Sequence, residues 1–409
     1  MGRPELIGST TKRDLRTGRS LWADSSGLGV SVDRLAAPIS VDVAIVGAGV
    51  SGAFMAHELS KTHSVAVLDR RPPLMGSTVA STALLQWEID LPLTELAKKI
   101  GPQKAKRAYL RSRRAVDALK QVVAEERIAC GLKDKSSLYL AGDQHGHRAL
   151  EAEAAARAEI GLDSRYLGPG ALRERFGVER TGAVVSSGSA SGDPARLAAG
   201  LLRRARANGA RIWSPVEVLQ AVSDPDGVTL LTDADHAVRA KSVVFCSGYE
   251  FPRGVPTPGL DVISTWAMAS TPRQRCPAWL RNMLVWEASD PYLYMRMSGD
   301  GRLIVGGEDE ASPVAHSDKA KLKRKCRTLA AELRRLLPHV AFEIDYAWAG
   351  AFGQSTTGLP RIGPVPGMEH TWAVMGFGGN GITYSVIAAQ IVAAEVRGEG
   401  DADADLYRT

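Results

Sequence analysis

Two periods of hydrophobic and polar positions alternate along this chain, and together they predict a layered α/β protein. Near the start, an apolar run over 41–46 is followed by a helix-like stretch over 50–60 and a second apolar run over 64–68. Short apolar runs bounded by glycine are typical of buried parallel strands, and a helix connects such strands. We therefore expect a βαβ unit over 41–68.

Helical spacing of apolar residues returns after residue 92. A helical region starts at Leu93 and is interrupted at 101–102 by a glycine and a proline. Further on, Asp193 and Pro194 combine a preferred N-cap with a preferred first helical residue. The longer helices that these patterns predict are 103–127, 147–160, 194–208, 319–337 and 381–396.

Strand patterns dominate the second half of the chain. The segments 224–227 and 298–301 have turn composition and separate apolar runs, which indicates hairpins. The expected strands are 137–141, 211–213, 216–222, 228–231, 237–239, 242–246, 292–297, 303–305, 341–351 and 371–375. A chain of 409 residues favours two domains.

Composition excludes several classes of protein. The net charge of +6 is mild, and the arginines follow predicted helices without interleaved aromatics, so no nucleic-acid partner is expected. The four cysteines form no C-x-x-C pair, so we expect no metal site and a reducing compartment. With no apolar signal segment at the start and no stretch of 18 apolar residues, we expect no membrane span and a cytoplasmic protein.

The first βαβ unit carries a dinucleotide-binding fingerprint. Gly47, Gly49 and Gly52 form G-x-G-x-x-G directly after the first strand, and Asp69 ends the second strand 22 positions after Gly47. The glycines permit a tight turn and a close approach to a pyrophosphate, whereas the aspartate is placed to accept from a ribose diol. The alternative is an α/β turn with no ligand. The turn residues expected to contact a cofactor are Gly47, Ala48, Gly49, Val50, Ser51 and Gly52.

A second glycine-rich turn, over 376–383, precedes the last helix. It cannot be a second complete dinucleotide site, because no further strand follows it. We expect its N–H groups and the helix N-terminus to reach another part of the same cofactor. The alternative is a loop that only packs. The residues expected to contribute are Gly378, Gly379, Asn380, Gly381, Ile382 and Thr383.

The segment 76–86 is rich in hydroxyl groups and follows Asp69 closely. It suits a loop that contacts phosphate or ribitol oxygens, although a capped surface helix is an equal alternative. Arg70 and Arg71 are expected either to stack on an adenine edge or to be solvated. The candidate contacts in the segment are Ser77, Thr78, Ser81, Thr82 and Leu85.

These motifs resemble the family of FAD-dependent amino-acid and amine oxidases, which includes D-amino-acid, glycine and sarcosine oxidases. The resemblance covers about 41–397 and adds Gly192-Asp193-Pro194 and Cys246-Ser247-Gly248 to the glycine turns. The phrases 84–90 and 291–294 look most like the γ-glutamylputrescine-oxidase-like branch.

The resemblance implies bound FAD, with further contacts from Val218, Ser247 and Gly248. It also implies a discontinuous Rossmann-type FAD domain and an inserted substrate domain built on an antiparallel or mixed sheet. The expected ranges are a lead-in over 1–40, an FAD domain over 41–100, 186–260 and 345–409, and a substrate domain over 101–185 and 261–344.

Two departures from the family pattern matter. In glycine oxidase an arginine that grips the substrate carboxylate follows a Trp-Ala-Gly-Leu stretch, whereas Phe352 follows the corresponding stretch here. Sarcosine oxidases tether the flavin through a cysteine in the same region, and no cysteine follows Cys326 here. We therefore expect noncovalent FAD and a substrate that is not a simple α-amino acid.

The catalytic candidates are Gln86, Tyr294 and Arg296. Gln86, with Glu88, comes just after the hydroxyl-rich segment and is expected to face the flavin. Tyr294 and Arg296 share one strand face by the two-residue period, and such a pair suits an anionic group. The alternative for Arg296 is a structural pair with an acid such as Glu287 or Glu308.

The leading hypothesis is therefore an FAD-dependent oxidoreductase that oxidises the C–N bond of an amine or N-substituted amino acid. Hydride passes to flavin N5, the imine hydrolyses, and oxygen or an electron carrier reoxidises the flavin. The alternatives are an NAD(P)-dependent dehydrogenase on the same fold and a flavin-binding protein without catalytic activity. The identity of the amine and the oligomeric state are not readable from the sequence.

Overall fold

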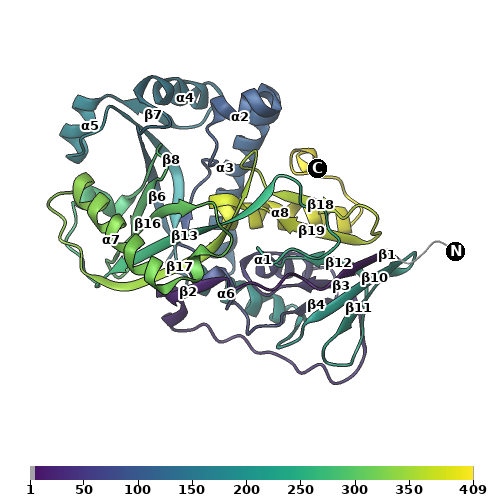
Figure 1. Ribbon diagram of the computed structural model, residues 1–409. Coiled ribbons are helices and arrows are strands. Elements are labelled where there is room, and N and C mark those ends of the chain that lie inside the picture. The colour runs from purple at the N-terminus through teal and green to yellow at the C-terminus, as the bar shows by residue number, and fades with distance from the viewer. Residues whose placement is uncertain (1–4, 409) are drawn as a thin grey trace.

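The computed structural model describes residues 5–408, and the strands in this range form two mixed sheets (Figure 1). The first sheet holds the parallel core β9-β4-β3-β12-β19, with antiparallel strands added at one side. Its strands are β1 (Glu5–Gly8), β3 (Ile39–Val46), β4 (Val65–Leu68), β9 (Arg211–Trp213), β10 (Val218–Asp224), β11 (Gly227–Thr232), β12 (Val238–Phe245), β18 (Arg361–Pro364) and β19 (Thr371–Met375).

Helices from distant parts of the chain cover one face of this sheet. They are α1 (Val50–Leu59), α6 (Pro194–Ala207) and α8 (Gly381–Val396), and α3 (Pro102–Glu125) packs on α8. α1 contacts both α6 and α8, and nearly all of its residues are buried. Because α1 has no polar face, it must be covered by other elements on all sides. The later helices α6 and α8 therefore pack against it on the first sheet.

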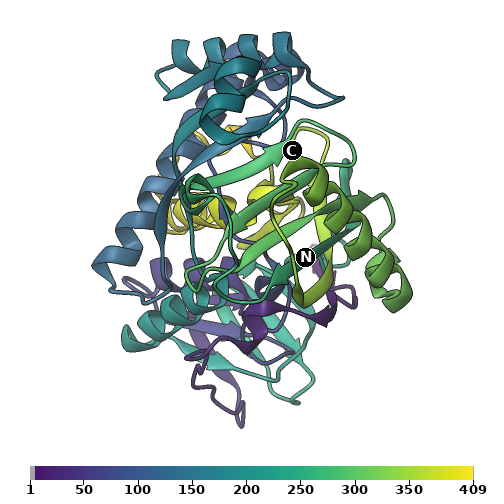
Figure 2. The same cartoon turned by 90° about the vertical axis from the view of Figure 1, so that its left-hand side faces the viewer.

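The second sheet runs in the order β2-β17-β13-β16-β15-β14-β6-β8-β5, with β7 beside β8. Its strands are β2 (Arg16–Arg19), β5 (Leu84–Leu85), β6 (Lys133–Leu140), β7 (Ser164–Leu167), β8 (Ala183–Ser191), β13 (Leu260–Ser270), β14 (Met283–Glu287), β15 (Leu293–Met297), β16 (Leu303–Glu310) and β17 (Ile344–Ser355). Helix α7 (Lys319–Leu336) packs on β13, β16 and β17 and lies in front of the sheet in Figure 2. Helices α2 (Leu93–Ile100), α4 (His147–Glu159) and α5 (Pro169–Phe176) lie at the far end, at the top of Figure 1.

The expected α/β class is confirmed, with both sheets mixed, and most of the long helices lie where the pattern predicts them. The Asp193 side chain caps α6 by accepting from the N–H groups of Ala195 and Arg196. The expected strands 237–239 and 242–246 are one strand, β12. The sequence pattern missed β1, β2, β5, β7, β18 and α5, which are too short to show a clear period. It also missed the longer strand β8, whose second half consists of serine, glycine and alanine.

The sheets divide the chain differently from the expected domain ranges at three places. Strands β5, β8 and β17 all belong to the second sheet, although the expected ranges gave residues 41–100, residues from 186 and residues from 345 to the nucleotide-binding part. The lead-in is also structured, since β1 joins the first sheet and β2 joins the second. Its Trp22 is buried and donates from Nε1 to the Ser81 carbonyl over 2.6 Å.

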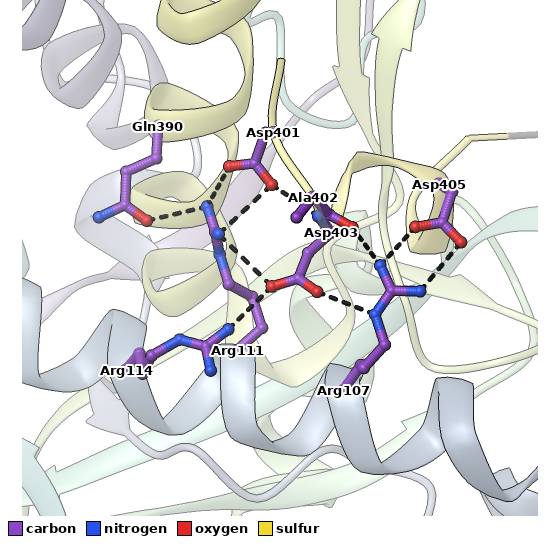
Figure 3. A network of polar contacts seen from close by, with 8 residues as sticks. All are labelled: Arg107, Arg111, Arg114, Gln390, Asp401, Ala402, Asp403 and Asp405. Atoms are coloured by element: carbon purple, nitrogen blue, oxygen red, sulfur yellow. Dashed lines mark hydrogen bonds and ion pairs between the residues drawn. The ribbon is translucent and has the colours of Figure 1, made fainter. Parts of the chain in front are cut away.

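The C-terminal tail is fixed to α3 by a charged network, which Figure 3 shows from close by. Three arginines of α3 face three aspartates of the tail: Arg107, Arg111, Arg114, Asp401, Asp403 and Asp405. Asp403 lies at the centre of the network, and its carboxylate is 3.1 Å from the Arg107 guanidinium and 2.8 Å from the Arg114 guanidinium.

No helix within residues 5–408 is both long and apolar enough to cross a lipid bilayer.

Candidate active site

A deep cavity lies against both sheets and holds about 1830 Å³ of space between atoms, its open mouth included. One end is formed by the turns that follow β3, β4 and β12, and the other by side chains of β13, β14 and β15. The glycine turn before α8 lies on it as well. The cavity therefore joins the fingerprint at the start of the chain with the glycine turn near its end.

The turn between β3 and α1 requires glycine at two positions. Gly47 has φ +116°, and a Cβ there would lie 2.4 Å from the carbonyl oxygen of Cys246. A Cβ on Gly52 would lie 1.8 Å from the Gly47 carbonyl oxygen. The backbone therefore closes tightly on itself, and the N-terminal end of α1 borders the cavity, where an anionic group is stabilised.

Asp69 lies at the cavity wall at the end of β4. Its carboxylate accepts from the N–H of Ala48 (2.7 Å) and from the N–H of Arg71 (2.8 Å). Burial raises the pKa of Asp69, whereas the two N–H groups favour the charged form. The carboxylate is held rigidly beside the glycine turn, which is the position that a ribose acceptor requires.

Arg70 and Arg71 line the same end of the cavity, and both are paired with acids. Arg71 binds Glu250 over 2.6 Å, and Arg70 contacts both Glu250 and Glu217. Burial raises the pKa of Glu250, but hydrogen bonds from Arg71 and Arg70 outweigh it and lower that pKa. The charges at this end are therefore compensated within the protein.

Two side-chain hydrogen bonds bind the C-terminal glycine turn to the segment after the hydroxyl-rich loop. Asn380 donates from Nδ2 to the Glu88 carbonyl over 2.6 Å, and Thr383 donates from Oγ1 to the Gln86 carbonyl over 2.8 Å. These contacts place the start of α8 directly beside the segment 86–90. Both glycine turns, at 47–49 and at 378–381, also line the same cavity.

The polar atoms on the wall fit a dinucleotide cofactor. Ser77 and Ser247 line the cavity, and their buried hydroxyls have no hydrogen-bond partner among residues 5–408. Buried hydroxyls without partners are costly, and phosphate or ribitol oxygens would satisfy them. Burial raises the pKa of the Cys246 thiol on this wall to about 12, so the thiol is protonated and a poor nucleophile.

Most of the predicted cofactor contacts lie on the cavity: Gly47, Gly49, Val50, Ser51, Asp69, Arg70, Arg71, Ser77, Thr78, Ser81, Thr82, Val218, Ser247, Gly248, Gly378, Gly379, Asn380, Gly381 and Ile382. Four others do not line it: Ala48, Gly52, Leu85 and Thr383. Ala48 and Leu85 are buried in the core, Gly52 packs on the Gly47 carbonyl, and Thr383 binds Gln86.

Of the catalytic candidates, Gln86 and Tyr294 line the cavity and Arg296 does not. The Arg296 guanidinium is fully buried and donates to the carbonyls of Thr82 (2.6 Å) and Gly192 (2.9 Å). Burial lowers its pKa to about 9. The expected Tyr–Arg pair for an anionic group is therefore wrong, because backbone carbonyls satisfy the arginine. The alternative partners are wrong as well, since Glu287 binds Arg180 and Glu308 binds Lys325.

Sequence reasoning missed several cavity residues at the sheet end. They are Asp90, Thr265, Trp286 and Tyr292. A signal exists for Asp90, because Gln86, Glu88 and Asp90 all line the cavity at a two-residue spacing while Trp87 and Ile89 are buried. The others lie on strands brought together only by the sheet order, which the local pattern does not contain.

Comparison with known proteins places this geometry in context. Residues 42–395 match the family model of FAD-dependent oxidoreductases, abbreviated DAO. Glycine oxidase from Geobacillus kaustophilus is 27% identical over 363 residues, which cover 86% of this chain and 92% of that one. Gamma-glutamylputrescine oxidoreductase from Escherichia coli is 22% identical over 396 residues, which cover 93% and 89%.

A solved structure shows the same fold. The crystal structure of glycine oxidase from Geobacillus kaustophilus has a TM-score of 0.76 at 24% identity and covers 89% of this chain and 96% of its own. The likeness extends over both sheets and not only over the nucleotide-binding part. The chain belongs to the DAO family of FAD-dependent oxidoreductases.

Proposed function

We propose that this enzyme oxidises the C–N bond of an amine or of an N-substituted amino acid at the sheet end of the cavity. The observation that carries the proposal is that the segment 86–90 is hydrogen-bonded to the glycine turn before α8. These bonds hold the part of the cavity wall proposed for the substrate beside the part proposed for the cofactor. Relatives named glycine oxidase and gamma-glutamylputrescine oxidoreductase support a C–N bond as the target.

FAD fits the cavity as the noncovalent cofactor of this reaction. We propose that Asp69 accepts from its ribose, that the start of α1 and the Ser77 hydroxyl hold its pyrophosphate, and that the α8 turn holds its flavin. When bound, FAD supplies the acceptor for a hydride equivalent from the carbon next to nitrogen, and water then hydrolyses the resulting imine.

The side chains of the sheet end bind, orient and desolvate the amine. Aromatic side chains wall this end of the cavity and exclude water from the reacting C–H bond. They are Trp286, Tyr292, Tyr294 and Phe352. Burial raises the pKa of Tyr294, so its hydroxyl stays neutral and orients by hydrogen bonding. Gln86 is neutral at every pH and serves the same purpose. These residues position the amine and are not proposed as general bases.

Phe352 makes a simple α-amino acid an unsuitable substrate. It follows Trp348-Ala349-Gly350-Ala351 on β17 and lines the cavity, so an apolar ring occupies the place expected for a carboxylate anchor.

We also propose the division into an FAD domain and a substrate domain, and oxygen as the final acceptor. The four free cysteines are usual for a reducing compartment, so we propose a cytoplasmic location.

Anaerobic reduction of the purified holoenzyme tests the function. A panel of primary amines, secondary amines and N-alkyl amino acids is mixed with the enzyme without oxygen, and flavin absorbance is followed. At least one amine is expected to bleach the flavin, and admission of air is expected to restore the colour with release of peroxide. A flavin that no member of the panel reduces would contradict the proposal.

A further inference from the structure

The cavity separates its charges between its two ends. Among the described residues that line it, the only cationic side chains are Arg70 and Arg71, and both are paired with Glu250 at the β4 end. Among the described residues, Glu88 and Asp90 line the sheet end and no lysine, arginine or histidine does. The Glu88 carboxylate is buried and faces away from the cavity's open space, so an anionic substrate group at that end would meet the Asp90 carboxylate with no such cation beside it.

Asp90 is the least compensated of these acids. Asp90 is exposed on the cavity wall. Its carboxylate accepts one hydrogen bond from the protein backbone, from the N–H of Gly379 over 2.7 Å. It forms no ion pair with any residue in the described range 5–408, and the surrounding protein raises its pKa. Glu88, by contrast, accepts from Ser137 and lies 3.9 Å from Arg157.

A second carboxylate, Asp309 on β16, lies just behind the cavity wall. Its Oδ2 accepts from the Tyr292 hydroxyl over 2.9 Å, whereas its buried Oδ1 has no hydrogen-bond partner among the described residues. Burial raises the pKa of Asp309 to about 6, and repulsion by Asp90 and Asp290 adds to the shift. A buried carboxylate oxygen without a partner is costly unless a ligand donates to it.

Aromatic rings complete this end of the cavity. Trp286 stacks on Tyr139 with ring centroids 3.7 Å apart, and its buried Nε1 has no partner in the part of the chain that the structure describes. The rings of Tyr292 and Tyr294 lie 5.7 Å apart on the same strand face. Aromatic faces beside carboxylates stabilise ammonium groups by cation–π and Coulomb attraction.

We infer that the substrate carries a second cationic group besides the reacting amine, as in a diamine or polyamine, and that Asp90 and Asp309 bind this group inside the aromatic walls. The inference rests on the proposed function and narrows its substrate class. A terminal ammonium pairs with the open carboxylate of Asp90 and offsets the buried charge of Asp309 behind Tyr292, whereas a terminal carboxylate is repelled by both.

Ligands that differ only in their terminal charge test the inference. Diaminobutane, butylamine and aminobutanoate share one carbon chain and end in a cation, an apolar group and an anion. Each is titrated into the holoenzyme without oxygen, and Kd is read from the perturbed flavin spectrum before reduction sets in; longer homologues repeat the series. The diamine is expected to bind at least about tenfold more tightly than the monoamine, and the anion weakest.

Two isosteric variants locate the effect. In Asp90→Asn and Asp309→Asn, the advantage of the diamine over the monoamine is expected to fall by about tenfold or more, with flavin content and melting temperature monitored to establish folding. Glu174→Gln, an exposed acid on α5, is the matched control and retains the preference. The inference is overturned if the anion binds as tightly as the diamine, or if both variants keep the wild-type order.

Flavin reduction by the same amines distinguishes a failure of this inference from a failure of the proposed function on which it rests. Flavin reduction by monoamines or amino acids, with no preference for a diamine, would overturn the inference and leave the proposed function standing. A preference in binding without flavin reduction by any amine would overturn the proposed function and, with it, the assignment of a diamine as substrate.

Discussion

The side chain of Asn380 donates to the backbone carbonyl of Glu88 over 2.6 Å, which joins two segments 292 positions apart in the chain. Asn380 belongs to the glycine turn before α8, and Glu88 belongs to the segment between β5 of the second sheet and α2. Both residues are buried and both line the cavity. This bond therefore fixes the cofactor wall from the end of the chain against the substrate wall from its start.

Removal of the Asn380 amide is expected to loosen the α8 turn. Asn380→Ala leaves the Glu88 carbonyl without its donor, and an unsatisfied buried group costs about 1 to 3 kcal/mol. FAD affinity, measured by fluorescence titration of the apoprotein, is expected to fall by tenfold or more. Asn208→Ala, at the end of α6 and away from the cavity, is the control. Equal FAD affinity in both variants would show that the turn does not depend on this bond.

A methyl group at Gly52 is expected to abolish cofactor binding. Its carbon would lie 1.8 Å from the Gly47 carbonyl oxygen, which is backbone and cannot move without opening the β3–α1 turn. Gly52→Ala should be isolated colourless or insoluble. Gly170→Ala, on α5 with nothing within 4 Å of the added carbon, should keep full flavin absorbance. A yellow, stable Gly52→Ala protein would contradict the geometry of the turn.

Asp309 gives the stability of the protein a defined pH dependence. Its folded-state pKa is raised to about 6, so between the ordinary carboxyl value and pH 6 the folded chain holds a proton that the unfolded chain has released. The stabilisation from the protonated form is complete below about pH 4 and is lost as the pH rises through about 6. Charged Asp309 therefore costs stability at neutral pH.

Asp309→Asn is accordingly expected to stabilise the protein at pH 8 by about 1 to 3 kcal/mol and to have little effect at pH 4. Denaturant unfolding at the two pH values, without amine ligands, measures the difference. Glu174→Gln provides the baseline for removal of an exposed acid. An asparagine variant that is less stable than the wild type at pH 8 would show that the carboxylate is compensated in the folded state.

The tail network gives a prediction that is independent of the cofactor. Asp403 is nearly buried among three arginines of α3, and it is the aspartate that Arg114 pairs with, whereas Arg107 and Arg111 also pair with Asp405 and Asp401. Asp403→Ala therefore removes the carboxylate that the three arginines share and should cost about 1 to 3 kcal/mol. Asp405, whose side chain is 51% exposed, pairs only with Arg107 among these arginines, and Asp405→Ala should cost at most about 1 kcal/mol. Chemical denaturation compares the two. The reverse order would contradict the central position of Asp403.

Local pattern was sufficient for the nucleotide-binding part of the fold. The apolar run over 41–46, the glycines after it and the acid at 69 all lie within one βαβ unit, where neighbours in sequence are neighbours in space. The same holds for Asp193, which caps a helix through its own following residues.

The sheet end of the cavity depends on contacts that local pattern does not contain. Arg296 was predicted to face the substrate because it shares a strand face with Tyr294, but its partners are carbonyls 214 and 104 positions away. Asp309 reaches Tyr292 only because β15 and β16 pair in a particular register. The order of strands in the second sheet decides which side chains meet, and no short window of sequence specifies that order.

The most direct test of the account is the stoichiometry of FAD binding. Apoprotein is prepared by removing the flavin under mild conditions and is titrated with FAD, with flavin fluorescence and the melting temperature recorded together. If the two glycine-dense ends of the chain enclose a single cofactor, the titration saturates at one FAD per chain, the melting temperature rises, and denaturation releases the flavin intact. A folded apoprotein that takes up no FAD would contradict the account.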